Sequence, residues 1–476
     1  SLIKAIPADI YVLVGGFDIN SQKKGRPFFN AAFLFKKNKL VKTFYKELLP
    51  TGDVFDEGRF IEKGSLQKNY FKIKNKVFFI TICEDIWAWE NTNGKSDYTS
   101  NPLLSVKKNK TDLVINLSAS PFYHGKLKQR EYLVSKTARY FKAPMAYVNM
   151  VGAQDEIIFD GQSFVVDAKG SKKLICQSFA EDLNVFELET LTDWNASTRL
   201  IKKQMRIAQT HKALVLGLQD FLKKTRIENV HLGLSGGIDS AVVACLAVDA
   251  IGADRVRLFA LPTEFNKPES FALANKLASN LKIPLQTISI QPFFNLLKKE
   301  LDKNFQIKQF GLMHENIQSR LRGLIMMAYS NAKNSMLLTT GNKSEYATGY
   351  ATLYGDMCGG LAPIGDLTKD EVYALARYYN TEYELIPNEI ITRAPSAELR
   401  PNQKDQDSLP AYNKLDAAVV SLVENHQSLK NETEEWLMPM LMKTEFKRWQ
   451  AAPILKVTKH SFGRGRRYPI AHRAQE

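Results

Sequence analysis

The chain lacks several features that would assign it to common classes of protein. Only four of its 476 residues are cysteine, they lie far apart, and none forms a Cys-x-x-Cys pair: Cys83, Cys176, Cys245 and Cys358. Neither a disulfide scaffold nor a zinc cluster is therefore indicated, and this cysteine usage predicts a reducing, cytoplasmic compartment. No uninterrupted apolar run approaches the ~20 residues that a membrane-spanning helix needs, and the opening residues do not resemble a signal peptide.

The composition is otherwise that of a folded protein with an excess of basic residues. Hydrophobic residues make up 44% and charged residues 24% of the chain, which excludes disorder over most of its length. Lys and Arg number 65 against 50 Asp and Glu, a net charge of +15. This charge favours anionic partners, which are nucleic acid, a membrane surface or phosphorylated small molecules. The basic stretch from Lys443 to Arg473 contributes to it, although a simply solvated basic face is the alternative.

The length suggests two to four domains, and the sequence pattern divides at about residue 190. Apolar runs typical of strands alternate with helical stretches in residues 1–190: Tyr11–Val14, Ala31–Phe35, Val77–Cys83, Leu113–Leu117, Met145–Asn149 and Ser163–Val166. Lys126–Lys142 is predicted to be helical. Strands and helices in alternation predict an α/β domain with buried sheets.

A polar segment, residues 191–212, is predicted to be a helical linker, and a second domain is expected over residues 213–476. It begins with an apolar helical stripe at Leu214, Leu218, Phe221 and Leu222, followed by alternating strands and helices: Val230–Leu234, Ala241–Ile251, Val256–Leu261 and Phe271–Leu281. This rhythm predicts a parallel, doubly wound sheet.

The hexapeptide Ser235–Ser240, Ser-Gly-Gly-Ile-Asp-Ser, lies between a predicted strand and a predicted helix. Gly236 and Gly237 let the backbone approach a phosphate, and the helix N-terminus favours an anion there. Asp239 is suited to holding Mg²⁺ on phosphate oxygens. The Gly-x-x-x-x-Gly-Lys motif that grips a γ-phosphate is missing, which suits cleavage of ATP between the α and β phosphates. The hexapeptide resembles the loop of the N-type ATP pyrophosphatases.

Three further segments resemble those of NAD synthetases: Glu315–Gly323, Thr339–Glu345 and Gly349–Asp356. The resemblance covers about residues 210–400 and implies adenylation of the nicotinate carboxylate of deamido-NAD, followed by amidation to NAD. It implies ATP contacts at Gly233, Leu234, Ser235, Gly236, Gly237, Ile238, Asp239, Ser240, Thr340 and Lys369. It assigns magnesium to Asp239 and Glu345, and deamido-NAD contacts to Asn316, Arg320, Glu345, Tyr350, Ala351, Thr352, Leu353 and Lys456.

Arg320 and Arg322 lie two residues apart on a predicted helix, so both cannot face one ligand. For Arg322 we expect a structural salt bridge.

The first domain contains a second group of reactive residues. Cys83 ends an apolar strand and is followed by Glu84 and Asp85, which suits a nucleophile at a strand end, although a lone cysteine is more often a buried core residue. This stretch, together with Lys46–Pro50, Phe55–Phe60 and Leu117–Phe122, resembles the nitrilase-type glutaminase domain of glutamine-dependent NAD synthetases. The resemblance implies that Cys83 is the nucleophile, Lys46 the catalytic lysine and Glu57 a supporting carboxylate. It also implies glutamine contacts at Ser120 and Lys126, and internal passage of ammonia to the adenylate.

The resemblance predicts the fold class of both domains. An N-terminal nitrilase-like α-β-β-α sandwich precedes a C-terminal adenine-nucleotide α-hydrolase-like, Rossmann-like parallel sheet that ends in a basic arm. The family's general-base glutamate lies on an early strand, which we expect to precede Ser1. The resemblance further implies a homo-oligomer, a dimer or larger, with ATP and Mg²⁺ as requirements and neither nucleic acid nor membrane as a partner.

Two alternatives remain at this stage. In the first, the glutaminase-like domain is inactive and free ammonia is the nitrogen donor. In the second, the chain is a basic RNA-binding protein with a related ATP site. This reading requires aromatic and basic RNA-binding platforms, which the sequence does not show, and it leaves the segments around Asn316 and Thr340 unexplained.

Overall fold

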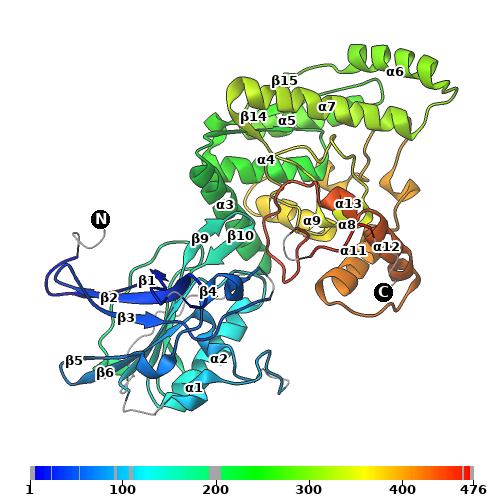
Figure 1. The fold of residues 1–476 in the computed structure, drawn as a ribbon. Helices are drawn as coiled ribbons and strands as arrows, with labels where there is room; N and C mark the ends of the chain where they lie inside the picture. Colours follow the sequence, from blue (N-terminus) through cyan, green and yellow to red (C-terminus); the bar gives the residue numbers. More distant parts are fainter. Residues whose placement is uncertain are drawn as a thin grey trace. The chain divides into compact units, whose positions relative to one another are not determined.

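The computed structural model describes residues 6–22, 24–52, 54–90, 94–106, 111–191, 205–463 and 466–471. The chain forms two compact units (Figure 1). The first comprises Ser1–Gly152 and Phe159–Lys203, and the second comprises Ala153–Ile158 and Gln204–Glu476. Most of the predicted linker, residues 192–204, lies outside the described residues, and residues 206–212 begin a long helix of the second unit, α3 (Arg206–Thr225). The sequence did not predict that Ala153–Ile158 would group with the second unit.

Two β-sheets form the centre of the first unit. The smaller sheet pairs β1 (Tyr11–Ile19), β2 (Phe28–Lys36) and β3 (Lys39–Tyr45) antiparallel, and β4 (Ile61–Glu62) runs parallel to β2. The larger sheet has the order β12-β11-β8-β7-β6-β5. In sequence order its strands are β5 (Tyr70–Ile73), β6 (Lys76–Ile82), β7 (Leu113–Ser118), β8 (Met145–Asn149), β11 (Phe164–Val166) and β12 (Lys172–Ile175). A separate hairpin pairs β9 (Val151–Gln154) with β10 (Ile157–Asp160).

The two sheets pack face to face because each presents an apolar side to the other. Ala32, Leu34 and Phe44 of the smaller sheet form one buried cluster with Ile80 and Ile82 of the larger sheet. Helices α1 (Pro102–Ser105) and α2 (Lys126–Phe141) contribute to a second cluster with the larger sheet. The sandwich predicted for this domain is therefore confirmed.

A four-stranded parallel sheet forms the centre of the second unit, as predicted. Its order is β15-β14-β13-β16, built from β13 (Asn229–Gly233), β14 (Val256–Ala260), β15 (Leu285–Thr287) and β16 (Ser335–Leu337). Helix α4 (Ile238–Ile251) follows β13 and is buried along nearly its whole length, which explains its almost uniformly apolar sequence. The helix begins three residues before the predicted Ala241, so Asp239 and Ser240 lie in its first turn.

Other helices surround this sheet: α5 (Pro268–Asn280), α6 (Gln291–Phe305), α7 (Leu312–Lys333), α8 (Lys343–Thr348), α9 (Lys369–Tyr379), α10 (Asn388–Thr392), α11 (Tyr412–Val419), α12 (Glu432–Lys443) and α13 (Glu445–Arg448). A short π-helical stretch, Val420–Glu424, continues α11. Helices α8, α11 and α12 share a core with the C-terminal segment through Ile454 and Phe462. Among the described residues, none of the helices combines the length and apolarity that crossing a bilayer requires.

Candidate active sites

Cys83 lies at a strained turn directly after strand β6. Its backbone φ is +44°, the left-handed region that non-glycine residues seldom adopt, and a 3-10 turn, Cys83–Ile86, follows at once. The side-chain amide of Asn116 donates to the Cys83 carbonyl at 3.3 Å. Such strain is retained where the surrounding structure fixes a residue firmly, and active sites are common examples. The turn is therefore suited to presenting a nucleophile.

Beside this turn, the buried Lys46 forms an ion pair with the partly buried Glu57. The Lys46 ammonium is 2.8 Å from both carboxylate oxygens of Glu57, and the lysine is only 1% exposed. Burial alone would disfavour the ammonium, but the charges of Cys83 and Glu57 raise the pKa of Lys46 above its usual value. Burial raises the pKa of the Cys83 thiol, and the Lys46 charge opposes that rise. The structure thus brings together the three catalytic residues proposed from the sequence.

Asp85 is a positioning residue that the sequence analysis did not identify. One of its carboxylate oxygens accepts from the N–H groups of Glu47 (3.0 Å) and Leu48 (2.9 Å), and the other accepts from Ile82 N–H (2.8 Å). Burial raises the pKa of Asp85 to about 6, which these hydrogen bonds partly oppose. Asp85 therefore joins the segment that carries Lys46 to the turn that carries Cys83.

For the glutamine hydrolysis that the sequence resemblance implies, replacement of Asp85 by asparagine is expected to lower activity with glutamine without affecting the use of ammonium. The substitution replaces one acceptor oxygen by an NH₂ group, which leaves at least one buried N–H unpaired and shifts Lys46 relative to Cys83. A displacement of about 1 Å in a reacting group costs about 100-fold in rate. The measurement is glutamate release from glutamine alongside NAD formation from ammonium. An equal loss with both donors would contradict this role for Asp85.

The two predicted glutamine contacts occupy different surroundings. The Lys126 ammonium lies 3.7 Å from the ring centroid of Trp87, the residue that closes the turn begun by Cys83. Ser120 is buried, and its hydroxyl accepts from Arg130 Nε at 3.1 Å. Arg130 in turn pairs with Asp160 at 2.7 Å, fully buried. The sequence offered no signal for the Arg130–Asp160 pair, because 30 residues separate its members.

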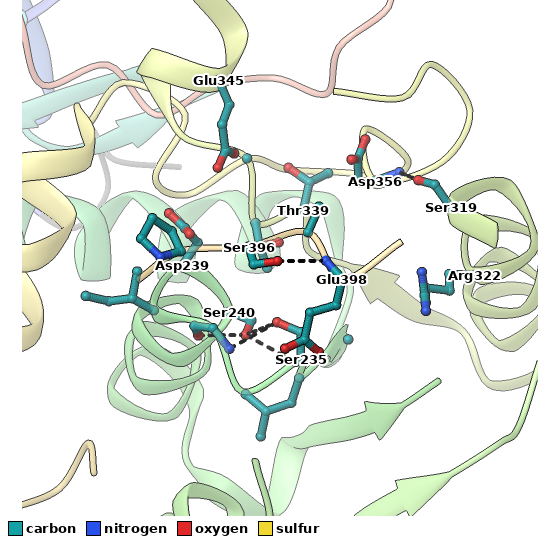
Figure 2. Close-up of a pocket in the computed structure, with 18 of the residues that line it drawn as sticks. Ser235, Asp239, Ser240, Ser319, Arg322, Thr339, Glu345, Asp356, Ser396 and Glu398 are labelled. Carbon is teal, nitrogen blue, oxygen red and sulfur yellow. Dashed lines mark hydrogen bonds between the residues drawn. The ribbon is translucent and has the colours of Figure 1, made fainter. Parts of the chain in front are cut away.

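The second unit contains a cavity of about 340 Å³ at the edge of its parallel sheet (Figure 2). Residues at the carboxyl ends of β13, β14 and β16 line it, together with α7, α8 and the segment that begins at Arg393. Ligands of open parallel α/β sheets bind at this edge, outside the carboxyl ends of the strands. The cavity is therefore the natural candidate for the ligand site of this unit.

The loop Ser235–Ser240 closes one side of this cavity. Gly236 has φ +80°, and a Cβ there would lie 2.2 Å from the Ser270 carbonyl oxygen, so only glycine fits. Gly237 caps α4, and its N–H donates to the Ser235 hydroxyl at 3.2 Å, while the hydroxyls of Ser235 and Ser240 lie 3.1 Å apart (Figure 2). The helix N-terminus at this point favours a bound phosphate. Apart from Gly236, all predicted ATP residues line the cavity: Gly233, Leu234, Ser235, Gly237, Ile238, Asp239, Ser240, Thr340 and Lys369.

Lys369 lies between two carboxylates of the cavity, one of which, Asp239, belongs to this loop. Its ammonium is 2.6 Å from Asp239 and 3.6 Å from Glu345. Asn342 donates to the other Asp239 oxygen at 2.9 Å and caps α8 by accepting from Glu345 N–H at 3.0 Å. Burial and the charge of Asp239 raise the pKa of Glu345 to about 8, and Lys369 opposes this shift. Asp405, another carboxylate that lines the cavity, acts electrostatically on both Lys369 and Glu345.

The residues predicted to contact deamido-NAD do not form one surface. Glu345, Tyr350 and Ala351 line the cavity, whereas Asn316, Arg320, Thr352 and Leu353 do not. These four contact each other instead: Thr352 donates to the Asn316 side-chain oxygen at 2.9 Å, and Arg320 donates to the Leu353 carbonyl at 3.3 Å. Lys456 is buried, 3% exposed, and lies outside the cavity lining.

The structural salt bridge expected for Arg322 is absent from the described residues, and that prediction was wrong. Arg322 lines the cavity and donates to the Leu261 carbonyl at 3.0 Å and to the Asn266 side-chain oxygen at 3.1 Å (Figure 2). Burial lowers its pKa to about 10, although Asp356 and Glu398 lie near enough to oppose the shift. Of the two arginines on α7, Arg322 is thus the one that faces the cavity.

Comparisons with known proteins match nearly the whole chain to relatives that share one name. A profile of the family described as NAD synthase matches residues 210–451. The glutamine-dependent NAD(+) synthetase of Synechocystis is 42% identical, over 99% of this chain and 86% of the relative. The protein of the same name from Thermotoga maritima is 35% identical, over 98% of this chain and 86% of the relative.

Solved structures extend this likeness to the fold. The glutamine-dependent NAD+ synthetase of Acinetobacter baumannii, solved with ADP, is 33% identical with a TM-score of 0.73, covering 98% of this chain and 85% of that chain. The corresponding enzyme of Cytophaga hutchinsonii, 20% identical with a TM-score of 0.77, shares the fold over 97% of this chain and 85% of its own. Because sequence and fold agree over nearly its full length, this chain belongs to the glutamine-dependent NAD(+) synthetase family.

Proposed function

We propose that this chain is an enzyme that amidates deamido-NAD to NAD at the expense of ATP, with glutamine as the nitrogen source. The observation that carries the proposal is the presence, in one chain, of two sets of reactive groups. One is Cys83 with the Lys46–Glu57 ion pair, and the other is the phosphate loop with Lys369, whose ammonium contacts Asp239 of that loop. Family membership accounts for both sets, whereas an RNA-binding protein would need neither.

In the first unit, the Cys83 thiolate attacks the side-chain amide carbon of glutamine. The developing oxyanion is stabilised by the Lys46 ammonium, which Glu57 holds in place at 2.8 Å. The proton lost by the Cys83 thiol is delivered to the amide nitrogen, the C–N bond breaks, ammonia leaves, and a glutamyl thioester remains on Cys83. Water then hydrolyses the thioester to glutamate. Lys126, beside Trp87, and Ser120 are proposed to contact the glutamine.

In the second unit, the nicotinate carboxylate of deamido-NAD attacks the α-phosphorus of ATP and pyrophosphate leaves. Ammonia then adds to the carboxyl carbon of the adenylate, and AMP departs as the amide forms. Gly237 and the N-terminus of α4 bind the phosphates, and Lys369 and Arg322 spread the transition-state charge. We also propose that the ammonia released at Cys83 reaches the adenylate within the protein.

Magnesium fits the donors on this cavity. Asp239 and Glu345 are hard oxygen ligands that approach the same Lys369 ammonium. Within the described ranges, no set of three or more acidic, histidine or cysteine side chains is arranged to hold a metal by itself. This arrangement suits Mg²⁺, which is commonly bound by one or two carboxylates together with substrate phosphates. When bound, the ion would neutralise charge on the triphosphate.

The exposed apolar side chains on α6 and α7 support a homo-oligomer. These helices contact each other and carry several solvent-exposed apolar residues: Phe293, Leu296, Phe305, Leu312 and Leu324. Several large apolar side chains exposed on two contacting helices are typical of a protein interface. We propose that a second copy of the chain covers it, as the family resemblance implies for the synthetase domain.

Replacement of Leu324 by glutamate is expected to dissociate the oligomer, because it would place a charge within an apolar interface. Light scattering of the purified protein measures the molar mass. Leu183→Glu is the matched control, since Leu183 is also exposed but lies in the other unit. A wild-type molar mass of one chain would disprove the oligomer.

The experiment that tests the proposed function is an assay of NAD formation from deamido-NAD, ATP and Mg²⁺ with either glutamine or ammonium. NAD formation with both donors, and glutamate formed in step with glutamine-derived NAD, is the expected result. Activity with ammonium alone would support the ammonia-dependent alternative, which the relatives do not favour. No NAD with either donor would disprove the proposal. The cytoplasmic location remains a prediction.

A further inference from the structure

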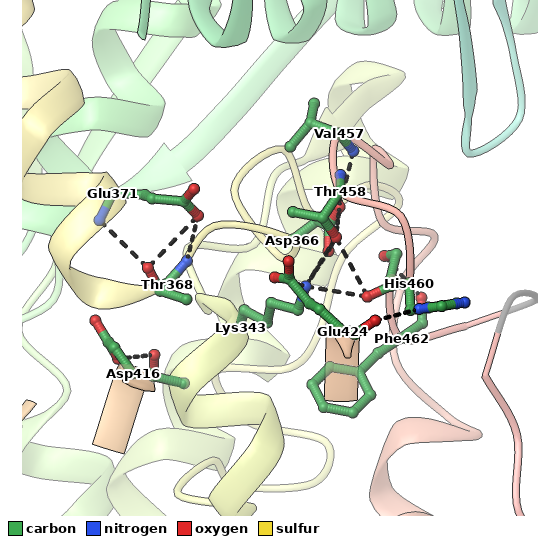
Figure 3. A network of polar contacts seen from close by, with 12 residues as sticks. Lys343, Asp366, Thr368, Glu371, Asp416, Glu424, Val457, Thr458, His460 and Phe462 are labelled. Atoms are coloured by element: carbon green, nitrogen blue, oxygen red, sulfur yellow. Dashed lines mark hydrogen bonds and ion pairs between the residues drawn. The ribbon is translucent and has the colours of Figure 1, made fainter. Parts of the chain in front are cut away.

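A buried lysine of the second unit lies outside both sets of reactive groups. Lys343, the first residue of α8, is fully buried (Figure 3). Its ammonium contacts Glu424 at 2.6 Å, the Thr458 hydroxyl at 2.8 Å, Asp366 at 2.9 Å and the His460 carbonyl at 3.0 Å. A buried charge is costly unless it is paired and hydrogen-bonded, and these oxygens come from three separate segments. Lys343 therefore occupies one defined position.

The partners of Lys343 attach the C-terminal segment to α8. One Asp366 oxygen accepts from the N–H groups of Val457 and Thr458, both at 2.7 Å, and from the Thr458 hydroxyl at 2.9 Å. The His460 ring lies 2.6 Å from the Glu424 carbonyl oxygen. Residues 457–460 are consequently held from two sides (Figure 3).

Asn342, the residue before Lys343, contacts a carboxylate that lines the nucleotide cavity. Asn342 bonds to Asp239 and caps α8 through Glu345, so the orientation of the first turn of α8 sets the positions of both carboxylates. Lys343 itself is the residue between Asn342 and the rest of that turn. A shift of Lys343 would therefore move both neighbours.

Lys343 and Asp366 are also linked to Lys369 through the backbone. Asp366 lies three residues before Lys369, and Lys343 N–H donates to the carbonyl of the intervening Leu367 at 2.7 Å. The Lys369 N–H in turn donates to the Ser344 hydroxyl at 3.2 Å. The start of α8 and the start of α9 are thus held against each other where their side chains enter the cavity.

Buried ion pairs contribute little net stability compared with apolar residues of similar volume, and removal of one partner is strongly destabilising. Such a cluster instead fixes the positions of the segments that it joins. We propose that Lys343 is a positioning residue: through Asp366, Glu424 and Thr458 it fixes the start of α8, and with it Glu345 and Lys369, for a magnesium-bound nucleotide. The inference rests on the proposed function of the cavity. It assigns to the C-terminal segment a role in nucleotide binding without contact with the nucleotide.

The test measures nucleotide binding rather than turnover. The probe is the α,β-methylene analogue of ATP, which cannot be cleaved at the bond that adenylation breaks, and calorimetry gives its Kd with and without Mg²⁺. Lys343→Met removes the ammonium group and all its contacts. Thr458→Val and Glu424→Gln each weaken those contacts while keeping the shape of the side chain. For each folded variant we expect the magnesium-dependent gain in affinity to fall about fivefold or more, with little change in binding without magnesium.

The control is Glu434→Gln. Glu434 is a buried carboxylate of the same unit that accepts from Lys430 N–H at 2.6 Å, away from the cavity. Its substitution should leave the magnesium effect unchanged, even if the melting temperature falls. If Lys343→Met does not fold, Thr458→Val and Glu424→Gln decide the question.

The two possible failures are distinguishable. The positioning role alone would be overturned if the folded variants Lys343→Met, Thr458→Val and Glu424→Gln kept the wild-type gain in affinity on adding magnesium. It would also be overturned if Glu434→Gln lost as much of that gain as they do. A wild-type protein whose nucleotide affinity is insensitive to magnesium would overturn the proposed function of the cavity, and the positioning role with it.

Discussion

Replacement of Cys83 by alanine is expected to abolish NAD formation from glutamine and to leave NAD formation from ammonium at the wild-type rate. In the proposed mechanism the Cys83 sulfur forms the covalent intermediate, and loss of a catalytic nucleophile lowers turnover by about 10⁴-fold or more. The second unit contains its own phosphate loop and its own charged cluster, and these use ammonia without Cys83. The measurement is the initial rate of NAD formation with each donor.

Cys176→Ala is the matched control for this experiment. Cys176 belongs to the same unit but is partly exposed, and its sulfur accepts from the Asn184 amide at 3.3 Å. Its replacement should leave both donors usable. Retention of glutamine-dependent activity in Cys83→Ala would show that another group is the nucleophile, and loss of the ammonium route would show that the substitution disturbs more than glutamine hydrolysis.

Short-range sequence patterns predicted the fold and part of each site. The run of apolar residues before Cys83 predicted a strand that ends at the nucleophile, and the structure ends β6 at Ile82. The Ser-Gly-Gly-Ile-Asp-Ser motif predicted a turn between strand and helix, which is where Gly237 caps α4. Both features are set by residues within a few positions of each other, which is why they can be read from the sequence.

The features that the sequence analysis missed depend on contacts between distant segments. Asp85 accepts hydrogen bonds from Glu47 and Leu48, 38 and 37 residues away, so nothing in its local sequence distinguishes it from an ordinary acidic residue after a strand. Asp405 joins the Asp239 cluster from a segment more than 160 residues downstream. Charge patterns along the chain carry no information about such proximity.

The error at Arg322 has a different origin. The two arginines of α7 were correctly predicted not to share one ligand, but helical spacing alone does not show which face is directed toward the cavity. The orientation of α7 is set by the packing of Ile317, Leu321 and Met326 in one core cluster with Phe259 of β14. Only the tertiary packing therefore shows that Arg322 is the arginine that faces the cavity.

Replacement of Lys369 by methionine is expected to lower NAD formation about 100- to 1,000-fold with glutamine and with ammonium alike, the usual cost of removing one group that stabilises transition-state charge. Lys369 is buried and lies 2.6 Å from Asp239 and 3.6 Å from Glu345. Without the Lys369 charge, burial and Asp239 would raise the pKa of Glu345 further above its present value of about 8, so that magnesium would have to displace the Glu345 proton at a greater cost.

The dependence on the donor separates Lys369 from Cys83. Adenylation precedes the use of ammonia from either source, so the loss in Lys369→Met should be equal for the two donors, whereas that in Cys83→Ala should be confined to glutamine. Lys276→Met is the control, because Lys276 is a half-exposed lysine of the same unit that pairs with Glu384 at 3.3 Å outside the cavity. Initial rates with each donor, on variants whose melting temperatures match the wild type, decide the point. A Lys369→Met enzyme with full ammonium-dependent activity would remove Lys369 from the adenylation step and leave the phosphate loop and Arg322 as the cavity's means of charge stabilisation.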